Sequence, residues 1–208
     1  MIAIVDYGVG NLFSLSSSFR ILGQEVVVTG EKKVLQQADR ILLPGVGAFE
    51  DAVRKLKQSG LFDLLREEAK KGKPLLGICL GMQLLFEKSY EYGEHEGLGL
   101  IPGSIRPISD VIPKDLKIPH IGWNALRFTE QKSPLFSELK DGDCVYFVHS
   151  YSAQCPAEYV TSYAEYGAML TASVQKGNVL GCQFHPEKSG EAGLRILRAF
   201  CELEDVKC

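Results

Sequence analysis

One cysteine lies in a segment whose pattern is typical of an enzyme nucleophile. The pentapeptide GICLG, residues 77–81, ends the apolar run Leu75–Ile78 and precedes a helical pattern over Met82–Phe86. In a sharp strand–turn–helix connection the central side chain is exposed at the carboxyl edge of a sheet, and glycines leave room for the turn. The following helix would favour the thiolate. The segment predicts a nucleophilic Cys79; the alternative is a buried core cysteine between two turn glycines.

A thiol nucleophile needs a base, and the chain has four histidines. His185 follows the apolar run Val179–Phe184 and is itself followed by Pro186 and Glu187. Proline keeps the preceding residue extended, and alternate residues of an extended chain point to the same side. Glu187 would therefore orient the imidazole of His185 toward Cys79. The alternative is a strand-end loop with a surface glutamate. The other three histidines fit a solvated loop (His95) and structural positions (His120 and His149).

Acyl chemistry also needs donors for an oxyanion. One would be the backbone N–H of Leu80, which directly follows the cysteine. A second would be the N–H of Val46, in the glycine loop Pro44–Gly47 that follows the apolar run Ile41–Leu43. An ordinary strand-to-helix turn is the alternative for this loop. The glycines at 8 and 10 do not complete a dinucleotide-binding fingerprint, because Phe13 stands where its third glycine is needed.

The elements that must position these residues alternate in type. Four apolar runs are continuous rather than alternating, which is typical of strands buried on both faces. They are Ile2–Val5, Val26–Val28, Ile41–Leu43 and Leu75–Ile78. Helical patterns lie between them, the first with Asn11 as its N-cap and Gly23 at its end, the others near Phe49–Leu56 and Leu61–Leu65. We therefore expect an α/β fold with a doubly wound, mostly parallel sheet and helices on both faces.

The second half of the chain differs in character. Residues 98–128 are rich in glycine and proline, and strand-like runs follow at Cys144–Val148, Tyr159–Tyr163 and Met169–Val174. Their short spacing predicts an antiparallel extension of the sheet, closed by a helix near Leu194–Phe200. No repeat or long linker divides the chain, so we expect a single domain over 1–208.

The composition of the chain argues against several classes of function. The chain has 208 residues with 23 Lys and Arg against 26 Asp and Glu, a net charge of −3, which argues against nucleic acid as a partner. No apolar run is long enough for a membrane span, and the first residues do not resemble a signal peptide. The six cysteines show neither a disulfide framework nor a metal-binding spacing. We expect a cytoplasmic protein that binds no metal.

With these residues in view, the segments GICLGMQ at 77–83 and HPE at 185–187 resemble the class I, or triad, glutamine amidotransferases. Three further segments, DYGVGN at 6–11, PGVG at 44–47 and PHIGWN at 119–124, are similar to one branch of that family. The branch comprises the glutaminase subunits of imidazole glycerol phosphate synthases. The likeness extends from Met1 to about Phe200 and leaves the tail Cys201–Cys208 uninterpreted.

The resemblance implies a reaction and a set of roles. Cys79 would attack the side-chain amide of L-glutamine to form a thioester, His185 would shuttle the proton, and Glu187 would hold His185, without a cofactor. The residues implied to hold glutamine are Gly47, Gln83, Ser150 and Tyr151. Ammonia would pass to a TIM-barrel cyclase subunit in a heterodimer, to form imidazole glycerol phosphate and an aminoimidazole carboxamide ribonucleotide in histidine biosynthesis.

The docking face expected for the cyclase carries Asn11, Trp123 and Lys188. Trp123 is the only tryptophan, and large aromatic residues are enriched as interface anchors; the alternative is that it belongs to the core. Three other functions remain open at this stage. They are a glutaminase subunit of a different synthase, an inactive scaffold subunit and a cysteine peptidase.

Overall fold

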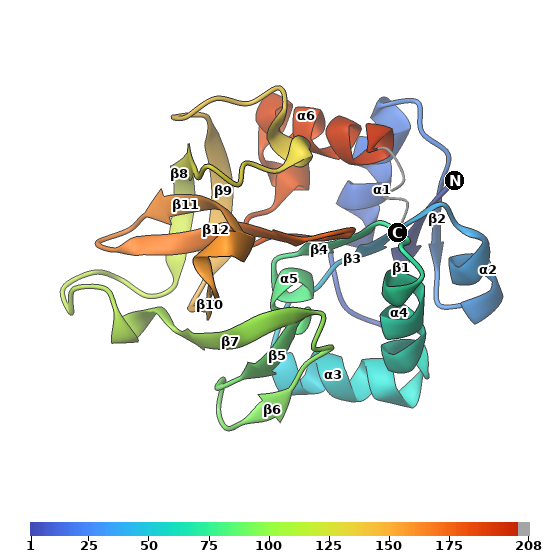
Figure 1. Ribbon diagram of the computed structural model, residues 1–208, viewed down its shortest axis with the longest axis horizontal. Helices are drawn as coiled ribbons and strands as arrows, with labels where there is room; N and C mark the ends of the chain where they lie inside the picture. Colours follow the sequence, from blue (N-terminus) through green and yellow to red (C-terminus); the bar gives the residue numbers. More distant parts are fainter. Residues whose placement is uncertain (204–208) are drawn as a thin grey trace.

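The apolar runs of the first half form the parallel part of a nine-stranded sheet (Figure 1). The computed structural model describes residues 1–203. Strands β1 (Ile2–Val5), β2 (Val26–Thr29), β3 (Arg40–Leu43) and β4 (Leu75–Ile78) pair in parallel, and β13 (Val179–Cys182) continues the parallel pairing beside β4. The predicted doubly wound α/β sheet is confirmed.

The antiparallel extension is confirmed as well. Next to β13 the sheet continues through β12 (Met169–Lys176), β11 (Val160–Glu165), β8 (His120–Phe128) and β9 (Cys144–His149), all in antiparallel pairing. In Figure 1 these strands occupy the left side, away from β1 and β2. The sheet therefore joins strands from the first and last parts of the chain, which brings residues near 79 and 185 to neighbouring strand ends.

Helices cover both faces of the parallel strands (Figure 1). Helices α1 (Leu12–Ile21) and α6 (Gly190–Glu202) lie on one face, with Ile2 and Ile4 of β1 in the hydrophobic core beneath them. On the other face Ala3 and Val5 belong to a second core, shared with α2 (Lys32–Gln37), α3 (Phe49–Gln58), α4 (Leu61–Lys70) and α5 (Leu80–Leu84). Burial on both faces explains why β1, β4 and residues 41–43 of β3 contain no polar side chain.

A second, four-stranded sheet was not predicted. Its order is β10-β7-β5-β6, built from β10 (Tyr151–Gln154), β7 (Ile101–Pro107), β5 (Phe86–Ser89) and β6 (His95–Glu96). The expected helix over Met82–Phe86 was wrong at its end, because α5 stops at Leu84 and Phe86 begins β5. Strand β7 lies in the segment rich in glycine and proline; pairing with β5 and β10, rather than local propensity, makes it a strand.

Two smaller expectations need correction. The run expected as a strand over Val179–Phe184 ends at Cys182, and a short 3-10 turn, η4 (Pro186–Lys188), follows it. Asn11 does stand at the N-cap of α1, but its side chain accepts no capping hydrogen bond. Its amide instead donates to Glu187 Oε1 at 3.5 Å, so the residue links α1 to the turn after β13.

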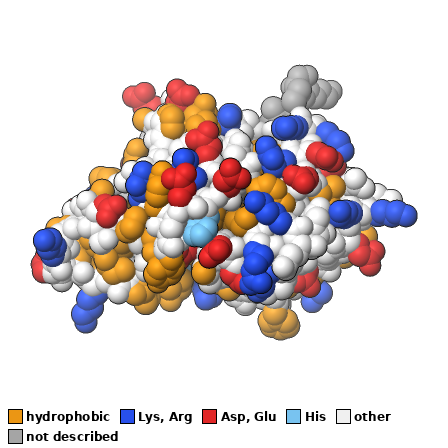
Figure 2. All heavy atoms as spheres, turned by 90° about the horizontal axis from the view of Figure 1, so that it is seen from below, with side chains coloured by type: hydrophobic (Ala, Val, Ile, Leu, Met, Phe, Trp, Pro, Cys, Tyr) orange, Lys and Arg blue, Asp and Glu red, His pale blue; other side chains and the backbone are white. Residues whose placement is uncertain are grey.

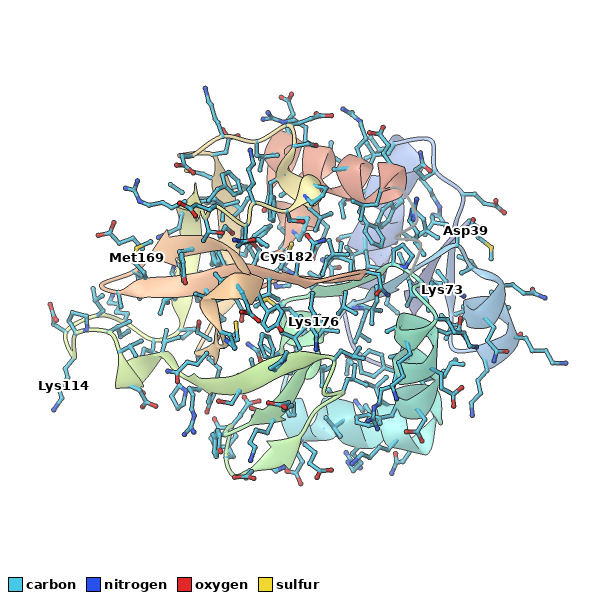
Figure 3. All side chains as sticks on the ribbon, viewed as in Figure 1. Asp39, Lys73, Lys114, Met169, Lys176 and Cys182 are labelled. Carbon is cyan, nitrogen blue, oxygen red and sulfur yellow. The ribbon has the colours of Figure 1, made fainter. Side chains whose placement is uncertain are left out.

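The surface carries charges of both signs. Seen from below in Figure 2, Lys and Arg side chains alternate with Asp and Glu, and hydrophobic side chains gather on the left part of this face. Figure 3 places Cys182 in the middle of the sheet and Lys114 at the outer tip of a loop. Among the described helices, none combines the length and the apolar character that crossing a membrane requires.

Candidate active site

Cys79 stands on a strained turn between β4 and α5. Its backbone has φ 55° and ψ −114°, and Tyr92 is the only other non-glycine residue with positive φ in the described part of the chain. The neighbouring glycines are required by contact: a Cβ on Gly81 would lie 1.9 Å from the carbonyl oxygen of Leu43, and one on Gly77 would lie 2.6 Å from that of Gly81. The tight turn at Cys79 therefore requires glycine at both 77 and 81, as in the sequence GICLG.

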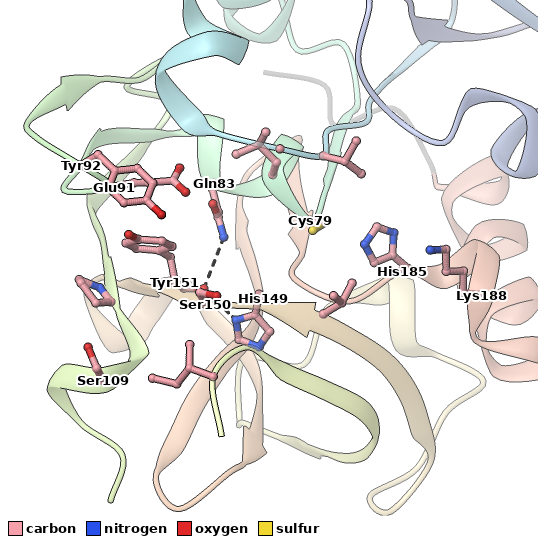
Figure 4. A pocket seen from close by; sticks show the side chains of 16 residues that line it. Cys79, Gln83, Glu91, Tyr92, Ser109, His149, Ser150, Tyr151, His185 and Lys188 are labelled. Carbon is pink, nitrogen blue, oxygen red and sulfur yellow. Dashed lines mark hydrogen bonds between the residues drawn. The ribbon is translucent and has the colours of Figure 1, made fainter. Parts of the chain in front are cut away.

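The thiol lies deeper than the sequence suggested. Cys79 was expected to be exposed, whereas only 8% of the residue is accessible. Loops from the antiparallel half surround the elbow and leave a pocket of about 550 Å³, with Cys79 in its wall (Figure 4). The N–H of Cys79 donates to the carbonyl oxygen of Cys182 at 2.7 Å, which ties the elbow to the end of β13.

His185 enters the same pocket from the end of β13. Its N–H donates to the carbonyl oxygen of Tyr146 at 2.9 Å, and Ser189 Oγ donates to its carbonyl oxygen at 2.7 Å. Its Nδ1 lies 2.8 Å from Glu187 Oε1. The expected reason for that contact was wrong: residues 186–188 form the 3-10 turn η4 rather than extended chain, and this turn brings the carboxylate back to the ring.

The charges around His185 favour its protonated form. Burial by itself lowers the pKa of His185, but hydrogen bonds to Cys79 and Glu187, together with their negative charges, outweigh burial and raise the pKa to about 9. The Glu187 side chain is 1% exposed, so its charge is poorly screened by water. An imidazolium held between a thiol group and a carboxylate is arranged to donate a proton to a leaving amine.

Both residues expected to stabilise an oxyanion border the pocket. Leu80 is the first residue of α5, so its N–H has no acceptor within the helix. Val46 lies on the loop after β3, and Gly47 next to it has φ 95°. The start of this loop is held by Tyr7, whose hydroxyl donates to the carbonyl oxygen of Pro44 at 2.8 Å.

The residues expected to hold glutamine also line this pocket. They are Gly47, Gln83, Ser150 and Tyr151. The amide of Gln83 is buried and donates to the carbonyl oxygen of Tyr151 at 3.4 Å and to Gln183 Oε1 at 3.0 Å. Gln83 therefore braces the wall of the pocket as well as facing it, and Figure 4 shows it directed toward Ser150 and Tyr151.

Sequence reasoning missed Glu91, which lines the pocket, and Gln183, which lies close to the thiol. Glu91 lies at the end opposite His185 (Figure 4), and its Oε2 accepts the N–H of Phe49 at 2.6 Å, at the start of α3. Nothing in its acidic, glycine-containing segment distinguished it from a solvated loop. Gln183 is buried, with Nε2 3.8 Å from Cys79 Sγ. Its position two residues before His185, in the run expected as a strand, was the signal that could have found it, because alternate residues of an extended chain point to the same side.

The residues expected to face a partner occupy two environments. Trp123 is 56% exposed, so the core alternative was wrong. Its ring centroid lies 5.8 Å from that of Tyr146, and Lys188 Nζ lies 5.7 Å from the centroid of the same Tyr146 ring. Asn11 is half-buried against Glu187, closer to the catalytic residues than to an outer surface.

No group of three or more His, Cys, Asp or Glu side chains in residues 1–203 is arranged to hold a metal ion. The chemistry open to the site is that of a cysteine, a histidine and a glutamate. A cysteine elbow beside a His–Glu pair on a doubly wound sheet is the arrangement of a triad acyl-transfer enzyme.

The family is shown by comparison with known proteins. The family model described as glutamine amidotransferase class-I matches residues 3–203, and the chain belongs to that family. Solved structures agree in fold: a crystal structure of a glutamine amidotransferase has a TM-score of 0.75 at 20% identity, covering 97% of this chain and 98% of that one. A structure of PurLQS from Thermotoga maritima has a TM-score of 0.71 at 20% identity, covering 97% of each chain.

Relatives of higher sequence identity indicate a particular branch of the family. An imidazole glycerol phosphate synthase subunit HisH of Bacillus cereus (strain ATCC 14579) is 51% identical over 200 residues, covering 96% of this chain and 93% of the relative. The protein of the same description from Lactococcus lactis subsp. lactis is 50% identical over 202 residues, covering 97% of this chain and 98% of the relative.

Proposed function

We propose that this chain is the glutaminase subunit of an imidazole glycerol phosphate synthase and acts in histidine biosynthesis. The observation that carries the proposal is the contact of the elbow cysteine with His185 in one pocket, where Glu187 holds the imidazole from behind. The choice of synthase is supported by the 51% identity to a HisH subunit over 96% of this chain. That identity argues against the glutaminase subunits of other synthases, and the complete triad argues against an inactive scaffold.

The reaction begins with attack of the Cys79 thiolate on the carboxamide carbon of L-glutamine. The electron pair of the carbonyl moves to oxygen, where the N–H groups of Leu80 and Val46 stabilise the negative charge. Imidazolium His185 gives its proton to the departing nitrogen, and ammonia leaves a thioester on Cys79. Water then attacks the thioester while His185 takes its proton; glutamate and the free thiol are the products. Glu187 stabilises the charged ring in both steps.

The charges along the pocket define how glutamine lies in it. The amide end must reach Cys79, so the zwitterionic end points toward Glu91, Tyr92 and Tyr151 (Figure 4). The Glu91 carboxylate is suited to the substrate ammonium group. Main-chain N–H groups near Gly47 and the Ser150–Tyr151 segment would bind the substrate carboxylate, with Gln83 bracing that segment.

Ammonia requires an acceptor, and we assign that role to a TIM-barrel cyclase subunit in a heterodimer with this chain. The description of the relatives as synthase subunits supports a second component. The docking face would carry Trp123, Lys188 and Asn11. The cyclase would consume ammonia to make imidazole glycerol phosphate and the aminoimidazole carboxamide ribonucleotide.

Two broader expectations belong to the same proposal. The chain forms one glutamine amidotransferase domain, supported by a nine-stranded sheet that contains strands from both halves of the chain; residues 204–208 of the expected range 1–208 lie outside the described residues. The protein works in the cytoplasm, where free thiols persist; five cysteines of the described residues are unpaired, including Cys79 and Cys144.

The test is a pair of cysteine variants in complex with the cyclase subunit. Cys79→Ala should abolish release of glutamate from glutamine, while synthesis from added ammonia continues, because only the nucleophile is lost. Cys144→Ala removes an exposed free cysteine and serves as the control, with both activities preserved. Glutamate release by Cys79→Ala at more than a few per cent of the parent rate would contradict the assignment.

A further inference from the structure

Two buried histidines, one in the wall of the pocket and one behind it, have no part in the reaction above: His149 lines the pocket and His120 does not. His120 begins β8 and His149 ends β9, and the two residues are partners in the antiparallel register. His120 Nδ1 lies 3.0 Å from His149 Nε2. His149 Nδ1 lies 2.7 Å from the carbonyl oxygen of Tyr151. The two rings therefore form a chain of hydrogen bonds that ends on a residue of the glutamine pocket.

The carbonyl oxygen of Tyr151 determines which ring nitrogen of each histidine carries the proton. A carbonyl oxygen only accepts, so His149 must donate from Nδ1. A neutral His149 then has an accepting Nε2, and His120 must donate to it from its own Nδ1. Only one arrangement of protons satisfies both hydrogen bonds when the two rings are neutral.

The surroundings keep His120 in this orientation. Its ring is stacked between Phe147, at 5.0 Å between centroids, and Tyr166, at 4.2 Å. Its Nε2 is buried and has no hydrogen-bond partner within residues 1–203. An unpaired acceptor in the interior is costly. The neutral form limits this cost, because the nitrogen left unpaired then carries neither a proton nor a charge.

Electrostatics also favours a neutral His149. Burial lowers its pKa to about 4, against the opposing effect of the hydrogen bond to Tyr151; positive charge on His120 or His185 would lower it further. Burial likewise lowers the pKa of His120 and outweighs the neighbouring Asn124 side chain, which acts in the opposite direction. The pair therefore remains uncharged at the pH at which a glutaminase works, even though the imidazolium of His185 is nearby.

The end of the chain of hydrogen bonds is a functional position. The carbonyl oxygen of Tyr151 accepts from His149 on one side and from Gln83 on the other (Figure 4). Ser150 connects β9 to β10, Tyr151 begins β10, and both residues line the pocket. The neighbouring carbonyl oxygen of Ser150 accepts from the N–H of Ile108 at 2.9 Å. Without the donor from His149, the carbonyl oxygen of Tyr151 would keep only the longer contact of 3.4 Å from Gln83.

We propose that His120 and His149 form a positioning pair that fixes the Ser150–Tyr151 corner of the glutamine pocket and so sets the affinity for glutamine. This inference rests on the glutaminase function proposed above. The pair touches no reacting atom, and its contribution should appear in glutamine binding rather than in the chemical step. A corner that contacts the unreactive end of the substrate contributes equally to the ground state and the transition state.

The test uses glutamine binding without turnover. In the Cys79→Ala background, within the complex with the cyclase subunit, calorimetry would compare His149→Phe, His149→Asn and His120→Phe. We expect His149→Phe to weaken glutamine binding about tenfold, since a donor is lost and a carbonyl is left with one partner. Asparagine retains an N–H near the place of Nδ1, so His149→Asn should recover most of the affinity. His120→Phe retains the stacking and should fall between them.

Tyr166→Phe is the matched control, because it preserves the stack on His120 and removes only the hydrogen bond from Tyr166 to the carbonyl oxygen of Lys117. It should bind glutamine like its parent. With Cys79 intact, the three histidine variants should raise the glutamine KM and leave kcat within about twofold. Nitrogen-15 NMR of the free chain should show the Nδ1–H form for both His120 and His149.

The experiments distinguish failure of the positioning role from failure of the proposed glutaminase function. An intact chain that releases no glutamate in the complex would contradict the glutaminase proposal. If the intact chain is active, equal glutamine affinity in the folded histidine variants and their parent would overturn the positioning role. A fall in kcat at constant KM, or an Nε2–H form of His149, would overturn it too. If His149→Phe does not fold, His149→Asn and His120→Phe carry the comparison.

Discussion

The two oxygens of Glu187 have different environments. Oε1 faces His185 Nδ1 at 2.8 Å and the amide of Asn11 at 3.5 Å, whereas Oε2 is buried without a hydrogen-bond partner within residues 1–203. A buried carboxylate with few donors is stabilised chiefly by a neighbouring positive charge. The glutamate and the imidazolium thus stabilise each other, and removing either charge leaves the other exposed to the low dielectric of the interior.

Glu187→Gln tests this dependence. The amide keeps the shape and an accepting oxygen but loses the charge, so the pKa of His185 should fall from about 9 toward its ordinary value of 6.5. Glutamine turnover should drop by about a hundredfold, less than for loss of Cys79. Glu191→Gln, on the exposed start of α6, is the control. Turnover of Glu187→Gln within a factor of two of the parent would contradict the triad.

The same substitution has a signature in stability. Because its folded pKa is raised, His185 stabilises the native state fully below pH 6.5 and loses that contribution as pH rises through about 9. The parent should therefore lose more unfolding free energy than Glu187→Gln between pH 6 and pH 9.5. Urea unfolding at the two pH values measures the difference, and parallel losses in the two proteins would exclude it.

An element can be predicted from the sequence when the residues that determine it lie within or next to it in the chain. Strands β1, β3 and β4 were predictable because every residue of the apolar runs is buried by the helices that follow. The elbow was predictable because its two glycines, which the tight turn requires, lie within two residues of Cys79 in the sequence. The sheet of β5, β6, β7 and β10 was missed because β7 lies in a segment rich in glycine and proline and is a strand only through pairing with β5 and the distant β10. Glu91 was missed with it.

The elbow offers a test of these local constraints. Gly81→Ala should destabilise the protein by about 3 kcal/mol or more, because its Cβ would lie 1.9 Å from the backbone oxygen of Leu43, which has little freedom to move. Gly177→Ala is the control: the position has φ 57° but no atom within 4 Å of a Cβ, so only the strain of about 1 kcal/mol remains. Denaturant unfolding gives both values, and equal losses would refute the contact argument.

Across the whole molecule, the antiparallel half connects the pocket to the surface. Strands β8 and β9 carry His120 and His149 at one end of their pairing and Trp123 beside Tyr146 three residues along β8. The N–H of His185 is bound to the carbonyl oxygen of the same Tyr146. A partner that contacts Trp123 would therefore press on a strand that is hydrogen-bonded to the catalytic histidine.

Trp123→Ala tests whether this surface is the docking face. Trp123 is exposed and packs edge-on against Tyr146, whose ring Lys188 also contacts, so it has the character of an interface anchor. Its loss should weaken binding of the cyclase subunit by about thirtyfold. The thermal midpoint of the free chain should change little, since the ring is half in solvent. Ile21→Ala is the matched control, because Ile21 is 73% exposed at the opposite end of α1 from Asn11. Calorimetric titration with the cyclase compares the two variants, and equal affinities would place the docking face elsewhere.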